Sequence, residues 1–233
     1  MPLTRTPAPD DIRLAVLDLA GTTVTDAGAV EEAFAHALRR AGVAERSERW
    51  ARMTEHVRAT MGESKIAVFR HLFGDDRAAE EANLAFEQAY AELVTGGRCA
   101  PIPGARGAVE ELRSAGVAVV LNTGFSPRTR DGLLSALGWQ DLADAVLSPA
   151  DAGRGRPYPD MVLTALLRTE APSVRQTAVV GDTPYDMEAG LRAGAGLVVG
   201  VLTGAHDKDD LRTAGAHHVL DSVAQLPGLL RER

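Results

Sequence analysis

Polar residues suited to phosphoryl transfer follow four short apolar segments of the sequence. These residues are Asp18, Thr123, Gly124, Arg156, Asp182 and Asp186. A carboxylate can attack phosphorus, while hydroxyl and backbone N–H groups hold the phosphoryl oxygens and an arginine offsets the repulsion between the two anions. Carboxylates are also oxygen ligands of the kind that Mg²⁺ prefers. Each residue alone more often has a structural role, but all of them in this order indicate one phosphoryl-transfer site.

The four apolar segments have the length and composition of buried strands in a parallel sheet. The predicted strands are Leu14–Leu17, Val117–Leu121, Ala145–Leu147, Thr177–Val180, Leu197–Val201 and Val219–Leu220. Helical patterns alternate with them at Gly107–Ala115, Ser126–Leu137, Met161–Arg168 and Met187–Ala193. This alternation predicts an α/β fold, a Rossmann-like doubly wound parallel sheet with helices on both faces. Open sheets of this type bind ligands beyond the carboxyl ends of their strands, where the polar residues should meet.

A helical region separates the first predicted strand from the others. The spacing of apolar residues predicts helices over Ala29–Ala41, Arg49–Thr60, Lys65–Phe73 with Ser64 as its N-cap, and Ala78–Val94. No strand is expected between Thr23 and Arg98. We therefore expect a core domain of residues 1–24 and 100–233, with an all-α domain of residues 25–99 inserted after the first strand.

The composition limits the classes of partner. The chain has 233 residues and a formal net charge of −7, so its global field does not favour nucleic acid or acidic membrane surfaces. Its single cysteine, Cys99, excludes an intramolecular disulfide, and no stretch approaches the length of a membrane-spanning segment. Met1–Arg13 lacks an apolar signal core. We expect a cytoplasmic protein with a small-molecule substrate and with neither nucleic acid nor membrane as a partner.

The sequence resembles the haloacid dehalogenase superfamily, whose hydrolases form an aspartyl-phosphate. The matching motifs are Asp18-Leu-Ala-Gly-Thr22, Asn122-Thr123-Gly124, Gly155-Arg156-Pro157 and Gly181-Asp182-Thr-Pro-Tyr-Asp186. The resemblance covers essentially the whole chain and implies that the inserted helices form a cap. It also implies Asp18 as the nucleophile and Mg²⁺ bound by Asp18, Asp182 and the backbone carbonyl of Ala20, with Asp186 steadying the site. Residues expected to bind the substrate are Met61, Thr22, Gly124 and Phe125.

Ala20 stands where most phosphatases of this superfamily have a second aspartate. That aspartate is the acid for the leaving alcohol and the base for water, so its loss would lower the rate of a P–O hydrolase about 10²–10⁴-fold. The phosphonatase branch, the phosphonoacetaldehyde hydrolases, has the motif Asp-x-Ala-Gly-Thr-Thr, which Asp18–Thr23 matches. Enzymes of this branch cleave a P–C bond, so no oxygen leaving group requires a proton.

In the phosphonatase branch a cap lysine forms a Schiff base with the aldehyde, and the iminium accepts the electrons released when phosphorus departs. Its motif, Met-Gly-x-x-Lys-Ile, is similar to Met61–Ile66 here, which makes Lys65 the expected Schiff-base residue. Met61, Lys65 and Phe69 would share one face if the helix extends back that far. Apolar surroundings would lower the pKa of Lys65 and keep some amine free. The alternative is a surface lysine whose stem lies on apolar neighbours.

The favoured hypothesis is a Mg²⁺-dependent phosphonatase-like hydrolase in which Lys65 binds a carbonyl phosphonate and Asp18 attacks phosphorus. Val68 and Phe125 replace a histidine and a tyrosine of that branch, so the expected substrate is phosphonoacetaldehyde or a close carbonyl-phosphonate analogue. One alternative is a Mg²⁺-dependent phosphatase of a small phosphate monoester. Another is a noncatalytic protein that binds a phosphorylated metabolite. The resemblance also implies a homodimer formed through the caps.

Overall fold

A six-stranded parallel sheet forms the centre of the computed structural model, which describes residues 11–232. Its strand order is β5-β4-β1-β6-β7-β8, with every neighbouring pair parallel. The strands are β1 (Leu14–Asp18), β4 (Ala118–Asn122), β5 (Ala145–Leu147), β6 (Thr177–Gly181), β7 (Leu197–Val201) and β8 (His218–Leu220). The predicted α/β fold class is therefore confirmed. Residues 1–10 and 233 of the predicted core domain lie outside the described residues.

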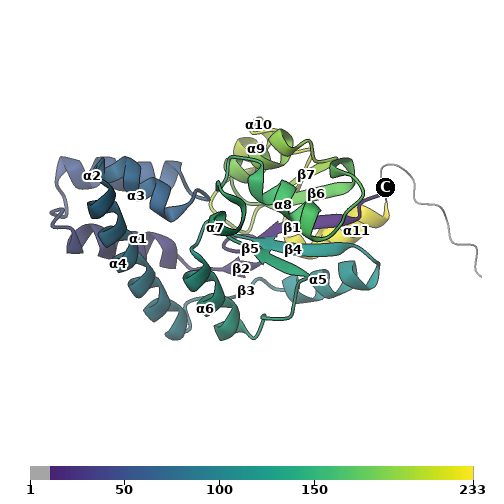
Figure 1. Cartoon of the computed structure of the whole chain (residues 1–233), viewed down its shortest axis with the longest axis horizontal. Helices are drawn as coiled ribbons and strands as arrows, with labels where there is room; N and C mark the ends of the chain where they lie inside the picture. The colour runs from purple at the N-terminus through teal and green to yellow at the C-terminus, as the bar shows by residue number, and fades with distance from the viewer. Residues whose placement is uncertain (1–10, 233) are drawn as a thin grey trace, which may run out of the picture.

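Helices cover both faces of this sheet (Figure 1). One face carries α5 (Ala105–Ser114), α6 (Pro127–Leu137) and α11 (Leu226–Arg231), and the other carries α8 (Asp160–Arg168), α9 (Pro184–Ala193) and α10 (Lys208–Thr213). Alternate residues of β1 enter the two cores, Leu14 and Val16 on one side and Ala15 and Leu17 on the other. Because β1 is buried on both faces, its sequence is a continuous apolar run.

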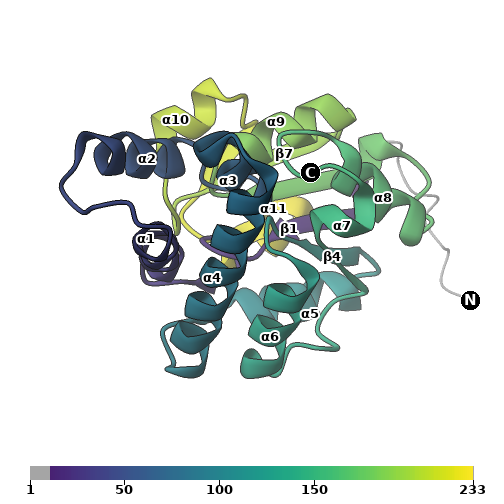
Figure 2. The same ribbon diagram turned by 60° about the vertical axis from the view of Figure 1, so that its left-hand side comes forward.

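Four helices between β1 and β4 form a separate group, the helical block, at one end of the sheet (Figures 1 and 2). They are α1 (Ala29–Arg40), α2 (Glu48–Ala59), α3 (Lys65–Phe73) and α4 (Asp76–Thr95). Phe34 joins them internally, because its ring centroid lies 4.9 Å from that of Phe69 and 4.8 Å from that of Phe86. The all-helical character of this region agrees with the sequence, while the domain boundaries at residues 25 and 99 stay a prediction.

The expectation of no strand between Thr23 and Arg98 was wrong. The short strand β2 (Val24–Thr25) pairs antiparallel with β3 (Ala100–Pro101), at the two ends of the helical block. A two-residue strand is too short to show an alternating pattern. The same reason explains why the short helices α7 (Pro149–Ala152), α10 and α11 were not predicted, nor the 3₁₀ turns η1 (Val174–Gln176) and η2 (Val223–Gln225).

Helix α3 begins at Lys65 and does not extend back to Met61. Gly62 has a φ of +94°, which an α-helix does not accommodate, so Met61 shares no helical face with Lys65 and Phe69. Lys65 and Phe69 do share a buried face, one turn apart. Ser64 takes the predicted N-cap position, but its side chain makes no capping hydrogen bond.

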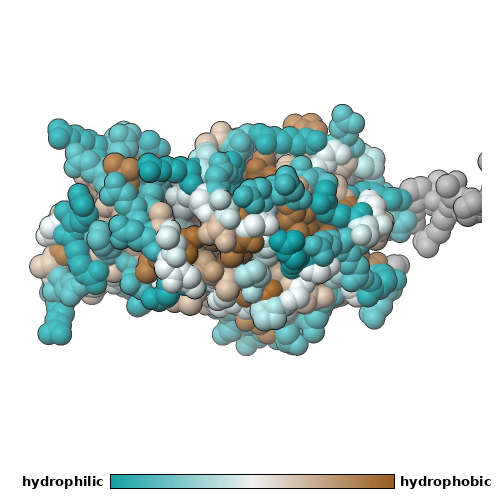
Figure 3. All heavy atoms as spheres, turned by 90° about the horizontal axis from the view of Figure 1, so that it is seen from below, coloured by the Kyte–Doolittle hydropathy of each residue, from teal (hydrophilic) through white to brown (hydrophobic). Residues whose placement is uncertain are grey.

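The face drawn in Figure 3 is largely hydrophilic, and hydrophobic residues occupy limited areas of it between hydrophilic ones. Exposed large hydrophobic residues of the described chain are Leu84, Tyr158, Leu163, Leu167, Leu191 and Leu202. Among residues 11–232, no helix combines the length and the apolar character needed to cross a membrane.

Candidate active site

A cavity of about 340 Å³ is lined jointly by the carboxyl ends of the central strands and by the helical block. The predicted site residues in its wall are Asp18, Ala20, Met61, Lys65, Thr123, Gly124, Phe125, Arg156 and Asp182. Thr22 and Asp186 are not part of this wall, although each contacts a residue that is. The structure therefore gathers the residues at the place expected from parallel topology.

Asp18 ends β1 and is almost completely buried. Its Oδ1 atom lies 2.8 Å from Nη1 of Arg156, yet the geometry is that of an ion pair and Oδ1 accepts no hydrogen bond. Burial raises the pKa of Asp18 well above its ordinary value, while the positive charge of Arg156 acts in the opposite direction. The nucleophile predicted from the sequence thus lines the cavity and has a carboxylate oxygen that accepts no hydrogen bond.

Asp182 and Asp186 are held by the segment that joins β6 to α9. Thr183 and Asp186 form a capping box at the start of α9, in which Thr183 Oγ1 donates to Asp186 Oδ2 at 2.6 Å. The Oδ1 atom of Asp182 accepts a hydrogen bond from Thr22 Oγ1 at 3.1 Å, and its Oδ2 atom accepts one from the backbone N–H of Ala205 at 3.0 Å. The fully buried Thr22 therefore lies behind Asp182, and its expected contact with substrate stays a prediction.

The three buried carboxylates fit a bound divalent cation. One oxygen atom each from Asp18, Asp182 and Asp186 lies within 4.8 Å of the others. Burial, followed by the charge of Asp186, raises the pKa of Asp182 to about 6. The three acids face a single buried arginine, so a cation would neutralise surplus negative charge, and an all-oxygen donor set suits Mg²⁺.

Asp186 is already engaged through both of its carboxylate oxygens. Its Oδ1 atom pairs with Arg156 Nη1, and its Oδ2 atom accepts hydrogen bonds from Thr183. Asp18 and Asp182 line the cavity and Asp186 does not, so the first two are better placed to ligate a cation directly, with Asp186 steadying Arg156. The contribution of the Ala20 carbonyl stays a prediction.

Lys65 lines the same cavity from the helical block and is only 7% exposed. Its Nζ atom donates to the carbonyl oxygen of Glu63 at 3.2 Å and lies 5.5 Å and 5.9 Å from the ring centroids of Phe125 and Phe34. Burial, followed by the charge of Arg156, lowers the pKa of Lys65 to about 8. The surface-lysine interpretation does not hold, because the amine is buried and part of it is uncharged near neutral pH.

The turn before Lys65 packs directly against loops of the sheet. A Cβ atom on Gly62 would lie 2.6 Å from Thr183 Oγ1, and one on Gly124 would lie 2.5 Å from the carbonyl oxygen of Glu63. The backbone N–H of Lys65 also donates to the carbonyl oxygen of Gly124 at 3.3 Å. Glycines at both positions allow this close approach, which fixes the helical block over the cavity.

Gly21, Gly62 and Thr183, which stand within the quoted motifs, also line the cavity. The sequence analysis missed other residues of the wall, which are Thr25, Asp26, Ala27, Gly28, Val30, Glu31, Thr203, Gly204 and Ala205. Thr203, Gly204 and Ala205 follow the end of β7 closely, so the rule that located Asp18 and Asp182 could have found them. Asp26 lies in the connection between β2 and α1, where its carboxylate accepts a hydrogen bond from the backbone N–H of Val30 at 3.1 Å. Neither a strand end nor a motif marks it.

Comparison with known proteins agrees with this site. A model of the haloacid dehalogenase-like hydrolase family matches residues 12–194. A phosphonoacetaldehyde hydrolase of Parabacteroides distasonis is 27% identical, over 76% of this chain and 77% of that protein. "Probable phosphatase IndB" of Dickeya dadantii is 27% identical over 92% of each chain. The crystal structure of a phosphonoacetaldehyde hydrolase-like protein from Oleispira antarctica is 26% identical, covers 95% of this chain and 92% of that one, and superposes with a TM-score of 0.79.

The family match spans most of the chain and includes all four motifs around the cavity. The strand ends carry the polar groups that this family uses, and the fold agrees with that of the solved relative. The chain belongs to the haloacid dehalogenase-like hydrolase family.

Proposed function

We propose that this hydrolase cleaves the P–C bond of phosphonoacetaldehyde or a close carbonyl-phosphonate analogue. The observation that carries the proposal is a buried amine, Lys65, lining the same cavity as the buried carboxylate of Asp18. Ala20, in the wall of the same cavity, offers no acid to an oxygen leaving group. The relatives named phosphonoacetaldehyde hydrolase support the same assignment.

In the proposed reaction, the free amine of Lys65 attacks the carbonyl carbon, the carbonyl oxygen leaves as water, and one proton taken up from solvent gives a protonated imine. An oxygen of Asp18 attacks phosphorus, the P–C bond breaks, and its electron pair moves onto the iminium to form an enamine. The enamine takes up a proton, and water releases the aldehyde from Lys65. A further water hydrolyses the aspartyl-phosphate to phosphate. The cycle consumes one water overall.

Other residues of the cavity wall contact either the phosphonate end or the carbonyl end of the substrate in this proposal. Arg156 and Thr123 hold the phosphonate oxygens, and Arg156 also offsets the repulsion between the substrate and Asp18. Asp18 and Asp182 would hold Mg²⁺, which when bound would neutralise part of the charge on the phosphonate. The ring of Phe125 lies 5.5 Å from the Lys65 amine and forms part of the apolar wall around the carbonyl end.

Trapping with borohydride tests the role of Lys65 with unusual specificity, because Lys65 and the exposed Lys208 are the two lysines of the sequence. We expect borohydride to fix phosphonoacetaldehyde on the wild type and on Lys208→Arg, but not on Lys65→Arg. Peptide mass spectrometry locates the adduct. Phosphate release from phosphonoacetaldehyde should follow the same pattern. Equal trapping on wild type and Lys65→Arg would exclude Lys65 as the Schiff-base residue.

The second candidate function is a phosphatase of small phosphate monoesters. The relative named as a probable phosphatase, which aligns over 92% of this chain, favours it. Ala20 disfavours it, since the leaving alcohol then lacks a proton donor at that position. Faster phosphate release from simple phosphate esters than from phosphonoacetaldehyde would select this alternative. The homodimer through the caps and the cytoplasmic location stay predictions, and size-exclusion chromatography with light scattering tests the first.

A further inference from the structure

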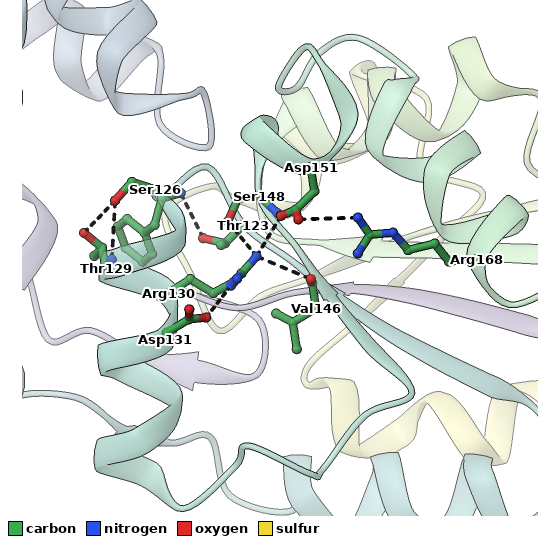
Figure 4. Close-up of polar contacts among 10 residues, drawn as sticks. Thr123, Ser126, Thr129, Arg130, Asp131, Val146, Ser148, Asp151 and Arg168 are labelled. Atoms are coloured by element: carbon green, nitrogen blue, oxygen red, sulfur yellow. Dashed lines mark hydrogen bonds and ion pairs between the residues drawn. The ribbon is translucent and has the colours of Figure 1, made fainter.

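Arg130 lies outside the cavity, in the first half of α6, and its side chain is 13% exposed. Figure 4 shows it reaching across to the end of β5 and the start of α7. Its Nη1 atom donates to Asp151 Oδ2 at 2.7 Å, to Ser148 Oγ at 3.2 Å and to the Val146 carbonyl oxygen at 3.4 Å. Its Nε atom donates to Asp131 Oδ1 at 2.7 Å. One guanidinium therefore connects α6 to the turn between β5 and α7.

Asp151 is the centre of this turn. Its Oδ2 atom also accepts a hydrogen bond from the backbone N–H of Ser148 at 2.9 Å, which completes the capping box of α7, and its Oδ1 atom accepts one from Arg168 at 3.4 Å. Burial acts to raise the pKa of Asp151, but the Ser148 bond and the charge of Arg130 together lower it. Asp151 is thus held as a carboxylate in a fixed position.

Two phosphoryl-binding segments meet at this turn. On one side, α7 ends at Ala152, and Arg156 follows four residues later to reach Asp18 at 2.8 Å. On the other side, the backbone N–H of Thr123 donates to the carbonyl oxygen of Leu147, at the end of β5, at 3.0 Å. A movement of the turn would therefore displace Arg156 and Thr123 relative to Asp18.

We propose that Arg130 is a positioning residue, which holds the β5–α7 turn so that Arg156 and Thr123 face one phosphoryl group. Arg130 is absent from the cavity wall, so it acts through Arg156 and not on the substrate. The inference rests on the proposed phosphoryl-transfer function, but it does not depend on whether a P–C or a P–O bond is cleaved.

Arg113 provides a matched control at the opposite end of the same strand. It lies on α5 and donates to Asp144 Oδ1 at 2.9 Å and to the Leu142 carbonyl oxygen at 3.0 Å, the same combination of carboxylate and carbonyl acceptors. Asp144 immediately precedes β5, whereas the cavity lies beyond the carboxyl ends of the strands. Removing Arg113 should affect stability without moving Arg156.

The test measures binding of inorganic phosphate in the presence of MgCl₂ by isothermal titration calorimetry. We expect Arg130→Leu to weaken binding about tenfold, because small displacements of a positioned group have large effects, and Arg113→Leu to weaken it less than about twofold. In an Arg156→Ala background, Arg130→Leu should weaken binding clearly less than in the wild type, because only the contribution through Thr123 remains and coupled residues are not additive. Turnover, measured as kcat for phosphate release, should show the same dependence on Arg156.

Asp151→Asn is a second variant, which keeps an acceptor for Ser148 while removing the ion pair, and it should reproduce part of the loss. An additive effect of Arg130→Leu in the Arg156→Ala background, or equal losses for Arg130→Leu and Arg113→Leu, would overturn the proposal. So would a wild type that binds no phosphate. A wild type that binds phosphate with the expected dependence, but releases none from phosphonoacetaldehyde, would uphold this inference and refute the proposed function.

Discussion

The cavity has two halves, a core half formed by the strand ends and a helical half formed by the helical block. Burial of a positively charged side chain has opposite outcomes in the two halves. In the core half, Arg156 pairs with Asp18 and Asp186, and these acids outweigh the effect of burial and raise its pKa. In the helical half, Lys65 faces a carbonyl oxygen and two aromatic rings, and burial lowers its pKa to about 8. Desolvation thus leaves a permanent cation where carboxylates outweigh it, and a titratable amine where the charges of Asp18, Asp26 and Glu63 offset it only in part. A phosphoryl group suits the first environment and a carbonyl group the second.

The largest expected effect comes from removing the nucleophile of the core half. Asp18→Asn should lower phosphate release from phosphonoacetaldehyde on the order of 10⁴-fold or more, because amide oxygen does not replace the attacking carboxylate. Borohydride trapping on Lys65 should persist, since the helical half is unchanged. A phosphate assay and peptide mass spectrometry measure the two effects. If Asp18→Asn lost both borohydride trapping on Lys65 and phosphate release, the two halves would not act independently.

Burial of the charged Lys65 side chain should destabilise the folded protein, so replacing Lys65 with an uncharged residue should raise the free energy of unfolding. The pKa of Lys65 is about 8 in the folded protein and 10.5 ordinarily, so its charged form opposes folding by about 3 kcal/mol at pH 7. This penalty is complete below about pH 8, shrinks as pH rises toward 10.5 and is absent above it. Lys65→Met should therefore raise the free energy of unfolding by up to about 3 kcal/mol at pH 7, measured by urea denaturation, and by little at about pH 10.5.

Lys208→Met is the control for this measurement, because Lys208 is exposed on α10 and its replacement should change stability by less than about 0.5 kcal/mol. An equal gain for Lys65→Met at both pH values would mean that better packing, and not loss of a buried charge, stabilises the variant.

The sequence predicted the core half more completely than the helical half, for a physical reason. Asp18 ends a strand, and Thr123 and Asp182 each directly follow one. In a parallel sheet the carboxyl ends of the strands lie at the same edge, so residues at these ends come close together. Local apolar patterns therefore determined where these side chains meet. Thr22 shows the limit of this reasoning, because a motif does not tell whether a hydroxyl faces the cavity or supports a neighbouring acid from behind.

Lys65 was predicted from its motif, but its surroundings were not. Its burial depends on Phe34 in α1 and Phe125 after β4, which no periodic pattern relates to α3. Its position also depends on Gly62, because the positive φ of this residue prevents α3 from extending back to Met61. Gly62 also packs closely against Thr183, which is distant in the sequence. Such contacts arise from tertiary packing, so a sequence pattern alone could not supply them.

A substitution at the boundary of the two halves should shift the preferred reaction. Ala20→Asp places an acid in the cavity wall, and we expect turnover of a simple alkyl phosphate ester to rise about 10- to 100-fold as the leaving oxygen gains a proton donor. P–C cleavage has no such leaving group and should not improve. Ala20→Asn is the matched control of similar size without a transferable proton. The same gain with asparagine would mean that the new side chain acts by binding and not by proton transfer.

The smallest expected effect is a difference in pH dependence between a reaction that uses Lys65 of the helical half and one that does not. Because the proposed Schiff base requires the uncharged amine of Lys65, kcat/KM for the proposed P–C cleavage should rise about tenfold per pH unit up to about pH 8 and then level off. Hydrolysis of the alkyl ester by Ala20→Asp does not use this amine, so its profile should lack that rise. Measuring both reactions with the Ala20→Asp variant keeps the rest of the cavity identical. If both reactions showed an inflection near pH 8, the titrating group would belong to the core half that they share. The difference in environment between Arg156 and Lys65 would then not account for the pH dependence of P–C cleavage.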